Sequence, residues 1–473
     1  MVTEIKLSAI KSAFIDKLTV LVLVHLLSIM LIFILFRGIA NSEKKKKKEL
    51  EFQANHDYLT QLWNRYYFDR YVANIDRNSV FSLIYLNINH FKNVNDNYGH
   101  GAGDQLLKQI AVRISTIAHK DDLVIRSSSA EFILICFHQT ERQTSETCNQ
   151  LLSSYHKPFL LEGSEITLSA SIGISCYPKD SSNPEDIIRN ADLAINSAKK
   201  EINKAVFFNQ SLLNEHLYLR NVEQELKKAI DNQELYMVYQ PQVSFDGSII
   251  GVEALIRWEN KKLGFMPPDK FIPIAESIGM MDEIGTFVIE RSLSDMMSLH
   301  TTTGVKNSLS INVSVKQFKN PDFFEDLMAL VRESNFPSEL LILEITESVL
   351  IDDIDAMQNL MVKIKAQNIR ISLDDFGTGY SSLSILNNLP IDELKIDKSF
   401  IDNVNSNEET RTMISSMITI AKSKNMKTVA EGVETKEMLL ALQVLECDIY
   451  QGYYFSKPID KNQLEQFTND NNR

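Results

Sequence analysis

Cysteine is scarce in this chain of 473 residues, and its four cysteines (Cys136, Cys148, Cys176 and Cys447) lie far apart. No two of them have the spacing of a metal-binding pair, so we expect reduced thiols and no disulfide framework. Positive charge is also in the minority, because 49 lysines and arginines face 62 aspartates and glutamates, which leaves a net charge of −13. No basic face is expected to dominate, and we therefore expect neither DNA nor RNA as a partner.

The remaining composition is that of an ordinary globular protein, with 44% hydrophobic and 23% charged residues. The length allows two or three domains, each large enough to bury its own core. We therefore expect folded domains rather than disorder.

Formal charge is absent from Leu18–Phe36, an almost wholly apolar run. The run is about as long as a helix that spans the hydrocarbon core of a bilayer, so we predict a transmembrane helix over residues 18–36. A cleaved signal peptide is the alternative, but no clear small-residue cleavage site follows. The segment at residues 37–49 is basic and contains five consecutive lysines, Lys44–Lys48, whereas the tail at residues 1–17 carries only scattered lysines. The positive-inside rule then places the rest of the chain in the cytoplasm, with the lysine run near membrane lipid.

Residues 50–209 alternate between strand-like and helix-like patterns. We expect strands at Ser79–Asn89 and Val124–Phe137 and helices at Gly103–Ala118 and Pro184–Lys200. The stretches DYLTQLWNRYYF, HFKNVNDNYGHGAGD, SIGISCYP and RNADLAINSAK resemble motifs of the GGDEF (diguanylate cyclase) family. This resemblance covers the whole segment and implies an α+β nucleotidyl-cyclase fold.

The residues that carry the chemistry of the GGDEF family are substituted in this segment. Ser128 and Ser129 stand where the family has two glycines that let the backbone approach phosphate, and Ala130 replaces a metal-binding acid. Asn87 replaces the other metal-binding aspartate, and Asn89 replaces a second aspartate nearby. Because such phosphoryl transfer needs divalent cations, the resemblance implies a degenerate domain without cyclase activity.

Further positions of the same family are partly altered. His119 stands in place of the arginine of an inhibitory product-binding motif, of which Asp122 remains, and Asn203 replaces a phosphate-contacting arginine. Asn95 and Asp104 are kept at positions that resemble the family's readers of the guanine edge. Two interpretations therefore stay open: the domain binds GTP weakly as a regulator, or it is a structural and dimerisation module.

A linker helix is expected at residues 210–230, and strands and helices then alternate over residues 231–473. The expected strands are Leu235–Val243, Ile249–Trp258, Leu309–Val315, Leu340–Thr346, Arg370–Asp375, Glu393–Ile396, Thr428–Glu431 and Asp448–Phe455. Helical patterns between them lie at Phe323–Ser334, Asp355–Gln367, Glu408–Lys424 and Lys436–Leu445. This alternation is typical of a TIM-like (β/α)8 barrel, an α/β fold whose chemistry lies at the C-terminal ends of the strands.

The stretch ISLDDFGTGY places Asp374 and Asp375 at the end of such a strand. Adjacent carboxylates repel each other unless cations lie between them, although a turn that merely caps a helix is the alternative. The motifs that surround this stretch are YQPQV, EALIRW, INVSVKQF, LEITES, DDFGTGYSS, LKIDKSF, AEGVET and QGYYFSKP. In this order they resemble the EAL family of cyclic di-GMP phosphodiesterases over nearly the whole segment.

This second resemblance implies an active site with two divalent cations, Mg²⁺ or Mn²⁺, that opens cyclic di-GMP to linear pGpG. The implied metal ligands are Glu253, Asn312, Glu344, Asp374 and Asp375. The implied catalytic residues are Glu253, Asp375, Lys395, Glu431 and Gln451, with Glu431 as general base or second-site ligand. Gln240 and Arg257 would contact the substrate, and Glu347 would anchor the loop after DDFG.

The expected function is thus a cyclic di-GMP hydrolase anchored in a bacterial inner membrane, with both domains in the cytoplasm and a homodimer as its assembly. A receptor that binds cyclic di-GMP without catalysis and signals to a partner protein is the alternative. Receptors of that type usually lack metal ligands in the barrel, and no implied ligand is substituted here. A bifunctional cyclase and hydrolase conflicts with Asn87 and Ala130.

Overall fold

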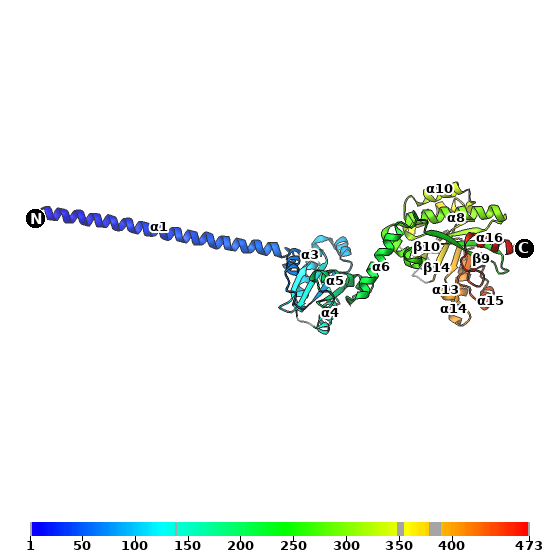
Figure 1. The fold of residues 1–473 in the computed structure, drawn as a ribbon, viewed down its shortest axis with the longest axis horizontal. Helices are drawn as coiled ribbons and strands as arrows, with labels where there is room; N and C mark the ends of the chain where they lie inside the picture. The colour runs from blue at the N-terminus through cyan, green and yellow to red at the C-terminus, as the bar shows by residue number, and fades with distance from the viewer. Residues whose placement is uncertain are drawn as a thin grey trace. The chain divides into compact units, whose positions relative to one another are not determined.

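The chain forms two compact units, Met1–Leu217 and Tyr218–Arg473. The computed structural model describes residues 2–137, 140–161, 163–201, 203–347, 354–377 and 389–471. Each unit has its own hydrophobic core, around a sheet in the first and a barrel in the second (Figure 1). The expected fold classes, an apolar N-terminal helix, an α+β domain and an eight-stranded barrel, are therefore confirmed.

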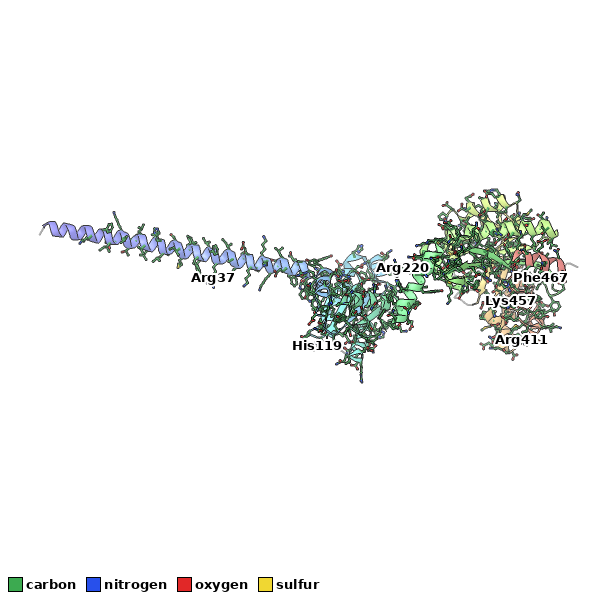
Figure 2. The ribbon with its side chains drawn as sticks, viewed as in Figure 1. Arg37, His119, Arg220, Arg411, Lys457 and Phe467 are labelled. Atoms are coloured by element: carbon green, nitrogen blue, oxygen red, sulfur yellow. The ribbon has the colours of Figure 1, made fainter. Side chains whose placement is uncertain are left out.

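The first unit begins with one long helix, α1 (Val2–Asn55). Its stretch Phe14–Asn55 contains a window with a mean hydropathy of 2.9, none of which is buried by the rest of the protein. Figure 2 shows side chains that stand out from this helix on all sides around the labelled Arg37. Among the residues described, α1 is the one helix that is long and apolar enough to cross a membrane.

A six-stranded sheet follows in the order β1-β3-β4-β2-β7-β8. Its strands are β1 (Trp63–Asn64), β2 (Phe81–Ile88), β3 (Leu123–Arg126), β4 (Glu131–Phe137), β7 (Ala170–Tyr177) and β8 (Ala205–Phe207). Alternate residues of β2 enter two separate cores, because side chains along a strand point to opposite faces. Helices α3 (Phe91–Ile117) and α4 (Glu141–Tyr155) cover one face, and α2 (Arg65–Ala73) and α5 (Pro184–Ala198) cover the other.

Two expectations for this unit need correction. The single strand expected at Val124–Phe137 is a pair of antiparallel strands, β3 and β4, because the polar residues after Arg126 turn the chain. The helix expected from Gly103 already begins at Phe91, since α3 contains two helical segments that meet at Gly99, where φ is 80°. The hairpin of β5 (Phe159–Leu161) and β6 (Ser164–Ile166) completes the unit, and α6 (Gln210–Leu226) leads into the next.

The second unit is a closed barrel with the strand order β10-β12-β13-β14-β15-β16-β17-β9, in which β9 also pairs with β10. Its strands are β9 (Leu235–Val243), β10 (Ile249–Asn260), β12 (Ser308–Asn312), β13 (Leu341–Thr346), β14 (Arg370–Phe376), β15 (Glu393–Ile396), β16 (Lys427–Ala430) and β17 (Ile449–Tyr450). A short strand, β11 (Gly264–Met266), pairs with the end of β10.

The first barrel strand runs in the opposite direction to the others. β9 pairs antiparallel with both of its neighbours, whereas the pairs from β10 to β17 are parallel. A tight turn joins β9 to β10, with Gly247 at a φ of 88° and Ser248 N donating to Asp246 Oδ1 at 3.0 Å. Antiparallel neighbours can be joined by a short hairpin and need no crossover helix, so the regular (β/α) alternation begins only at β10.

Helices surround the barrel on its outer side. They are α7 (Pro268–Ile278), α8 (Met281–Thr303), α9 (Val315–Phe318), α10 (Phe323–Ser334), η1 (Ser338–Leu340), α11 (Ile354–Lys365), α13 (Lys398–Ile401), α14 (Glu408–Ser423), α15 (Lys436–Val444) and α16 (Lys461–Asn471). The expected strands that reached Val315 and Phe455 end earlier, at Asn312 and Tyr450. At both places the chain leaves the sheet for loops at the rim that carries the polar residues.

Candidate active site

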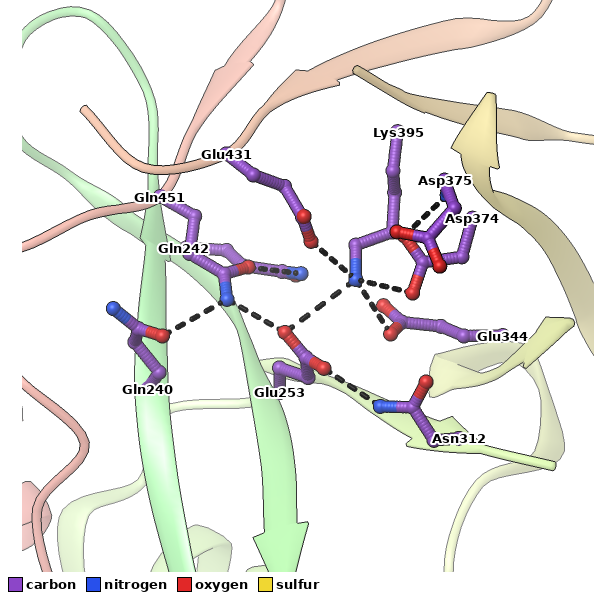
Figure 3. Close-up of polar contacts among 10 residues, drawn as sticks. All are labelled: Gln240, Gln242, Glu253, Asn312, Glu344, Asp374, Asp375, Lys395, Glu431 and Gln451. Carbon is purple, nitrogen blue, oxygen red and sulfur yellow. Dashed lines mark hydrogen bonds and ion pairs between the residues drawn. The ribbon is translucent and has the colours of Figure 1, made fainter. Parts of the chain in front are cut away.

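The polar residues singled out in the second unit meet at the C-terminal ends of the parallel strands. On β14, Leu373 is fully buried in the apolar core, so the alternation of side chains turns Asp374 into the barrel. Glu344 on β13 and Lys395 on β15 point inward in the same way (Figure 3). The other residues that converge on this point are Gln240, Gln242, Glu253, Asn312, Asp375, Glu431 and Gln451.

The ammonium group of Lys395 lies at the centre of this cluster and is fully buried (Figure 3). Lys395 Nζ lies 2.6 Å from Glu431 Oε1 and 2.7 Å from Glu344 Oε2. It also lies 3.4 Å from an oxygen of Glu253 and 3.4 Å from an oxygen of Asp374. One ammonium group thus faces four carboxyl groups. Because the cluster is buried from water, the attraction and repulsion between these groups are strong.

Amide groups hold the carboxylate of Glu253 from two sides. Asn312 Nδ2 donates to Glu253 Oε1 at 2.7 Å, and Gln451 Nε2 donates to Oε2 at 2.6 Å. Gln451 Nε2 also donates to Gln240 Oε1 at 3.1 Å, while Gln451 Oε1 accepts from Gln242 Nε2 at 3.0 Å. Gln242 was missed in the sequence, although its place two residues after Gln240 on one strand was an available signal.

Burial and mutual repulsion shift the protonation of these groups. Burial and the charge of Glu253 raise the pKa of Glu344 well above its usual value. Burial likewise raises the pKa of Glu431 to about 7, although the nearby Lys395 opposes the shift. Burial would raise the pKa of Glu253 as well, but Lys395 and the two amide donors lower it. Lys395 keeps its proton firmly, because Asp374 and the glutamates raise its pKa against the effect of burial.

The side chains of the cluster fit a divalent cation. Oxygen atoms of Asp374, Asp375 and Glu431 lie within 4.8 Å of one another. Glu344 Oε1 is buried and has no hydrogen-bond partner in the described part of the chain. Asp375 has a left-handed φ of 56°, and its amide donates to Asp374 Oδ1 at 2.9 Å, so the backbone bends sharply between the two acids. A donor set made only of oxygen suits Mg²⁺ or Mn²⁺.

A cavity of about 630 Å³ lies next to the cluster, between β10, β12 and the helices α7 to α9. Arg257 and Asn312 line it, and Ile272, Met281 and Val288 give it apolar walls. Arg257 is half-buried, and burial lowers the pKa of its guanidinium group. The cavity therefore joins an apolar surface to a cationic group close to the carboxylates.

Glu347 lies directly after β13 and is buried. The segments at residues 348–353 and 378–388, which include part of the DDFGTGYSS motif, are outside the described residues. The proposed contact between Glu347 and the loop after DDFG therefore stays a prediction.

In the first unit, two residues at the substituted positions of the GGDEF-like motif, Asn87 and Ser128, form hydrogen bonds with Glu131. Asn87 Nδ2 donates to Glu131 Oε1 at 3.2 Å, and Tyr85 Oη and Ser128 Oγ donate to Glu131 Oε2 at 2.9 and 2.8 Å. Burial, followed by the charge of Glu131, raises the pKa of Tyr85 to about 12. Three neutral donors thus bond to Glu131, the residue that directly follows the substituted positions Ser128, Ser129 and Ala130.

The other substituted and retained positions lie near by. Ser129 and Ala130 lie between β3 and β4, and the carbonyl of Ser129 accepts a hydrogen bond from Arg126 at 3.3 Å. Asn95 packs against Gly103, where a Cβ would lie 2.0 Å from Asn95 Oδ1, and Asp104 is the next residue. The structure thus brings Asn95 against Gly103, the residue before Asp104, while nucleotide binding there stays a prediction.

Comparison with known proteins gives matches to both units. The family model "EAL domain" matches residues 223–458, and "Diguanylate cyclase, GGDEF domain" matches residues 54–205. Cyclic di-GMP phosphodiesterase NbdA of Pseudomonas aeruginosa is 33% identical over 88% of this chain and 54% of its own length. Bifunctional diguanylate cyclase/cyclic di-GMP phosphodiesterase MucR of the same organism is 34% identical over 90% of this chain and 63% of its own. The chain therefore spans only about half to two thirds of these relatives.

A solved structure of the PaMucR phosphodiesterase in a c-di-GMP complex is 34% identical, with a TM-score of 0.50. The match covers 52% of this chain and 99% of that one. Sequence motifs, family models and architecture agree, and the chain belongs to the family of tandem GGDEF–EAL domain proteins.

Proposed function

We propose that the chain is a membrane-anchored cyclic di-GMP phosphodiesterase that hydrolyses cyclic di-GMP to linear pGpG in its barrel domain. The observation that carries this proposal is the cluster of carboxylates around Lys395 at the strand ends. Such a cluster suits cation-assisted hydrolysis of a phosphodiester. The substrate is supported by two relatives, NbdA and MucR, which are both named as cyclic di-GMP phosphodiesterases.

The cations would be held by Glu253, Asn312, Glu344, Asp374 and Asp375. When bound, Mg²⁺ or Mn²⁺ would neutralise charge on the phosphodiester and lower the pKa of the attacking water. Asn312 and Gln451 fix the orientation of Glu253 through their hydrogen bonds before any substrate arrives. Before cations bind, the positive charge of Lys395 would offset the repulsion among the carboxylates.

Glu431 and Lys395 are suited to handle the proton and the charge of the reaction. Glu431 Oε1, on a carboxyl whose pKa burial raises to about 7, would accept the proton of the water that attacks phosphorus. Lys395 Nζ, 2.6 Å from that oxygen, would stabilise the negative charge that develops on the phosphoryl oxygens. Breakage of the bond to the 3′ oxygen would then open the ring and give pGpG.

The cavity beside the cluster would receive one nucleotide of the substrate. Its volume of about 630 Å³ is within the usual range for ligand pockets. The guanidinium group of Arg257 would contact a phosphate, for which its fork of donors is well suited. Ile272, Met281 and Val288 would pack against a purine ring, and Gln240 would contact the substrate from β9.

We propose that the first domain, at residues 50–209, has no cyclase activity and acts as a regulatory or dimerising module. Residues 210–230 would link it to the barrel domain at residues 231–473. The hydrogen bonds from Asn87 and Ser128 to Glu131 support this proposal, because the place of two acids and two glycines is taken by neutral side chains.

Residues 18–36 of α1 are proposed to anchor the protein as a single span in a bacterial inner membrane, with both domains in the cytoplasm. The uncovered apolar window of α1 supports the span, and Lys44–Lys48 after it support the orientation. The tail at residues 1–17 would then lie outside, and the basic segment at residues 37–49 would lie at the inner surface.

Incubation of the purified full chain with cyclic di-GMP and Mg²⁺ in detergent micelles tests the activity, with chromatography of the products. We expect pGpG to accumulate, and EDTA or Asp374→Asn to stop its formation. Asp402→Asn is the matched control, because Asp402 is an exposed acid just after α13. Tight binding of cyclic di-GMP by the folded wild type without any pGpG would contradict the hydrolase and favour a receptor.

A further inference from the structure

The barrel interior below the carboxylate cluster is polar. Ser310, Ser372 and Glu393 lie on β12, β14 and β15, each two positions before a residue of the cluster. Because alternate residues of a strand share a face, these three side chains form the next layer inside the barrel. In barrels of this kind, bulky aliphatic residues usually fill such layers. We call Ser310, Ser372 and Glu393 the polar layer.

The polar layer is buried, and several of its polar atoms have no partner in the protein. Ser310 and Ser372 are 0% exposed, and Glu393 is 2% exposed. Throughout the described ranges, Ser310 Oγ, Ser372 Oγ and Glu393 Oε1 have no hydrogen-bond partner, and neither has Glu344 Oε1 in the cluster above. In native proteins nearly all buried polar atoms have a hydrogen-bond partner, and buried water bonds to those that the protein itself leaves unsatisfied.

Strand register places each serine beside a glutamate of the cluster. Ser310 is the parallel partner of Glu253, and Ser372 is the parallel partner of Glu344. Ser372 is also the partner of Glu393 on β15, so Glu344, Ser372 and Glu393 follow one another across three strands. Adjacent strands lie about 4.8 Å apart, and a water molecule between two such side chains can bond to both. Serine side chains are smaller than the branched aliphatic residues that are usual in such layers.

Water fits this mixture of atoms better than an ion does. Glu393 offers acceptors, the serine hydroxyls offer both donors and acceptors, and Arg370 Nε is a donor that is also buried without a partner. Burial raises the pKa of Glu393, whereas the charges of Arg370 and Lys395 and the adjacent Ser372 hydroxyl group lower it. The two positive charges would repel a cation in the layer. The carboxylate of Glu393 would likewise repel an anion.

We propose that ordered water molecules occupy the polar layer and connect Ser372 and Glu393 to Glu344. Through this water, Ser372 is a positioning residue for a carboxylate that would hold a cation. The effect on the reaction rests on the proposed function, whereas the hydration of the layer does not.

A crystal structure of the full chain with Mn²⁺, at a resolution that shows ordered water, tests the hydration directly. We expect water within hydrogen-bond distance of Ser310 Oγ, Ser372 Oγ and Glu393 Oε1. A dry layer, in which these side chains bond to one another instead, would overturn the proposal. Water in the layer of a protein that proves inactive would support the hydration and count only against the proposed function.

Two substitutions of Ser372 distinguish the effect of losing the water from the effect of losing the hydroxyl group. Ser372→Val fills the space, so we expect Mn²⁺ affinity, measured by calorimetry, to fall about tenfold. We expect kcat to fall while KM changes little. Ser372→Ala removes the hydroxyl but leaves space for water, and its Mn²⁺ affinity should stay closer to that of the wild type. Thermal unfolding shows whether both variants fold, and a folded Ser372→Val variant with wild-type Mn²⁺ affinity would overturn the positioning role.

Discussion

Lys395 Nζ donates to Glu344 Oε2 at 2.7 Å, and both side chains are wholly buried. The same ammonium group contacts the carboxylates of Glu253, Asp374 and Glu431. Lys395 therefore has a structural task that is separate from any part in catalysis. In the absence of cations, it supplies the positive charge that lets these acids lie together.

Lys395→Met should make the stability of the barrel depend on divalent cations. Removal of one partner from a buried ion pair costs about 3–5 kcal/mol of unfolding free energy. We expect a lower unfolding temperature in EDTA, and a larger recovery with Mn²⁺ than the wild type shows. Lys422→Met removes an exposed lysine that pairs with Glu446 and should change little. Equal unfolding temperatures of Lys395→Met and wild type in EDTA would contradict the structural task of Lys395.

Gln451→Ala should weaken cation binding without unfolding the protein. Gln451 orients Glu253 by a hydrogen bond of 2.6 Å, and loss of such a partner typically costs about 10- to 100-fold in metal affinity or activity. Titration calorimetry with Mn²⁺ and the kcat of cyclic di-GMP hydrolysis measure the two effects. Gln443→Ala, at an exposed position of α15, serves as the control. Unchanged Mn²⁺ affinity in Gln451→Ala would show that Glu253 is oriented by other means.

The cation-free barrel should lose stability as pH rises towards neutrality. Burial raises the pKa of Glu431 from its usual value of 4.5 to about 7. Between these values the folded protein keeps a proton that the unfolded chain releases. The stabilisation is therefore complete below the lower value and is lost as pH rises through the higher one. The pKa of Glu344 is also raised and acts in the same direction.

Unfolding temperatures in EDTA at about pH 5 and about pH 7.5 measure this loss. Glu431→Gln should reduce the change in unfolding free energy between these two pH values by up to about 3 kcal/mol. Glu437→Gln, which changes an exposed glutamate on α15, should leave it as in the wild type. The idea fails if Glu431→Gln and wild type show the same pH dependence.

Asn87→Asp should destabilise the first domain without giving it cyclase activity. The substitution replaces a hydrogen bond to Glu131 by repulsion between two carboxylates, at a cost of about 1–3 kcal/mol. We expect a lower unfolding temperature, which Mg²⁺ partly restores. We expect no cyclic di-GMP from GTP, because the second metal-binding acid is still replaced by Ala130. Asn97→Asp, at an exposed position of α3, is the control. Formation of cyclic di-GMP from GTP by the wild type would refute the proposal that the first domain has no cyclase activity.

Deletion of residues 18–36 should release the protein from the membrane. The apolar window of α1 is uncovered by the rest of the chain, and a helix of this kind is held in a bilayer by burial of its side chains. Fractionation with an alkaline carbonate wash should leave the full chain in the membrane pellet and the shortened chain in the supernatant. A full chain found in the supernatant would rule out a membrane span.

The positions of the cluster residues in the barrel follow from local sequence patterns. Apolar runs such as the one before Asp374 predict buried strands, and the polar residue at the end of each run marks the rim. The parallel sheet then brings Glu344, Asp374 and Lys395 together, because their strands are neighbours.

Strand direction and turns were harder to predict. Apolar alternation does not depend on strand direction, so the reversal of β9 was not evident. The break between β3 and β4 was hidden because apolar residues flank the turn on both sides. The unpaired hydroxyl groups of Ser310 and Ser372 depend on packing across several strands, which no local pattern reports.

The reversed first strand also decides at which rim the preceding polypeptide reaches the barrel. Leu235, where β9 begins, pairs with Trp258, which lies beyond Glu253 on β10. The part of α6 that belongs to this unit, with Val222 and Leu226 buried in the barrel core, therefore joins at the rim that carries the acids. Had β9 been parallel to β10, the chain would have arrived at the opposite rim. A force applied along α6 is thus delivered at the rim that carries the acids, without first crossing the length of the barrel.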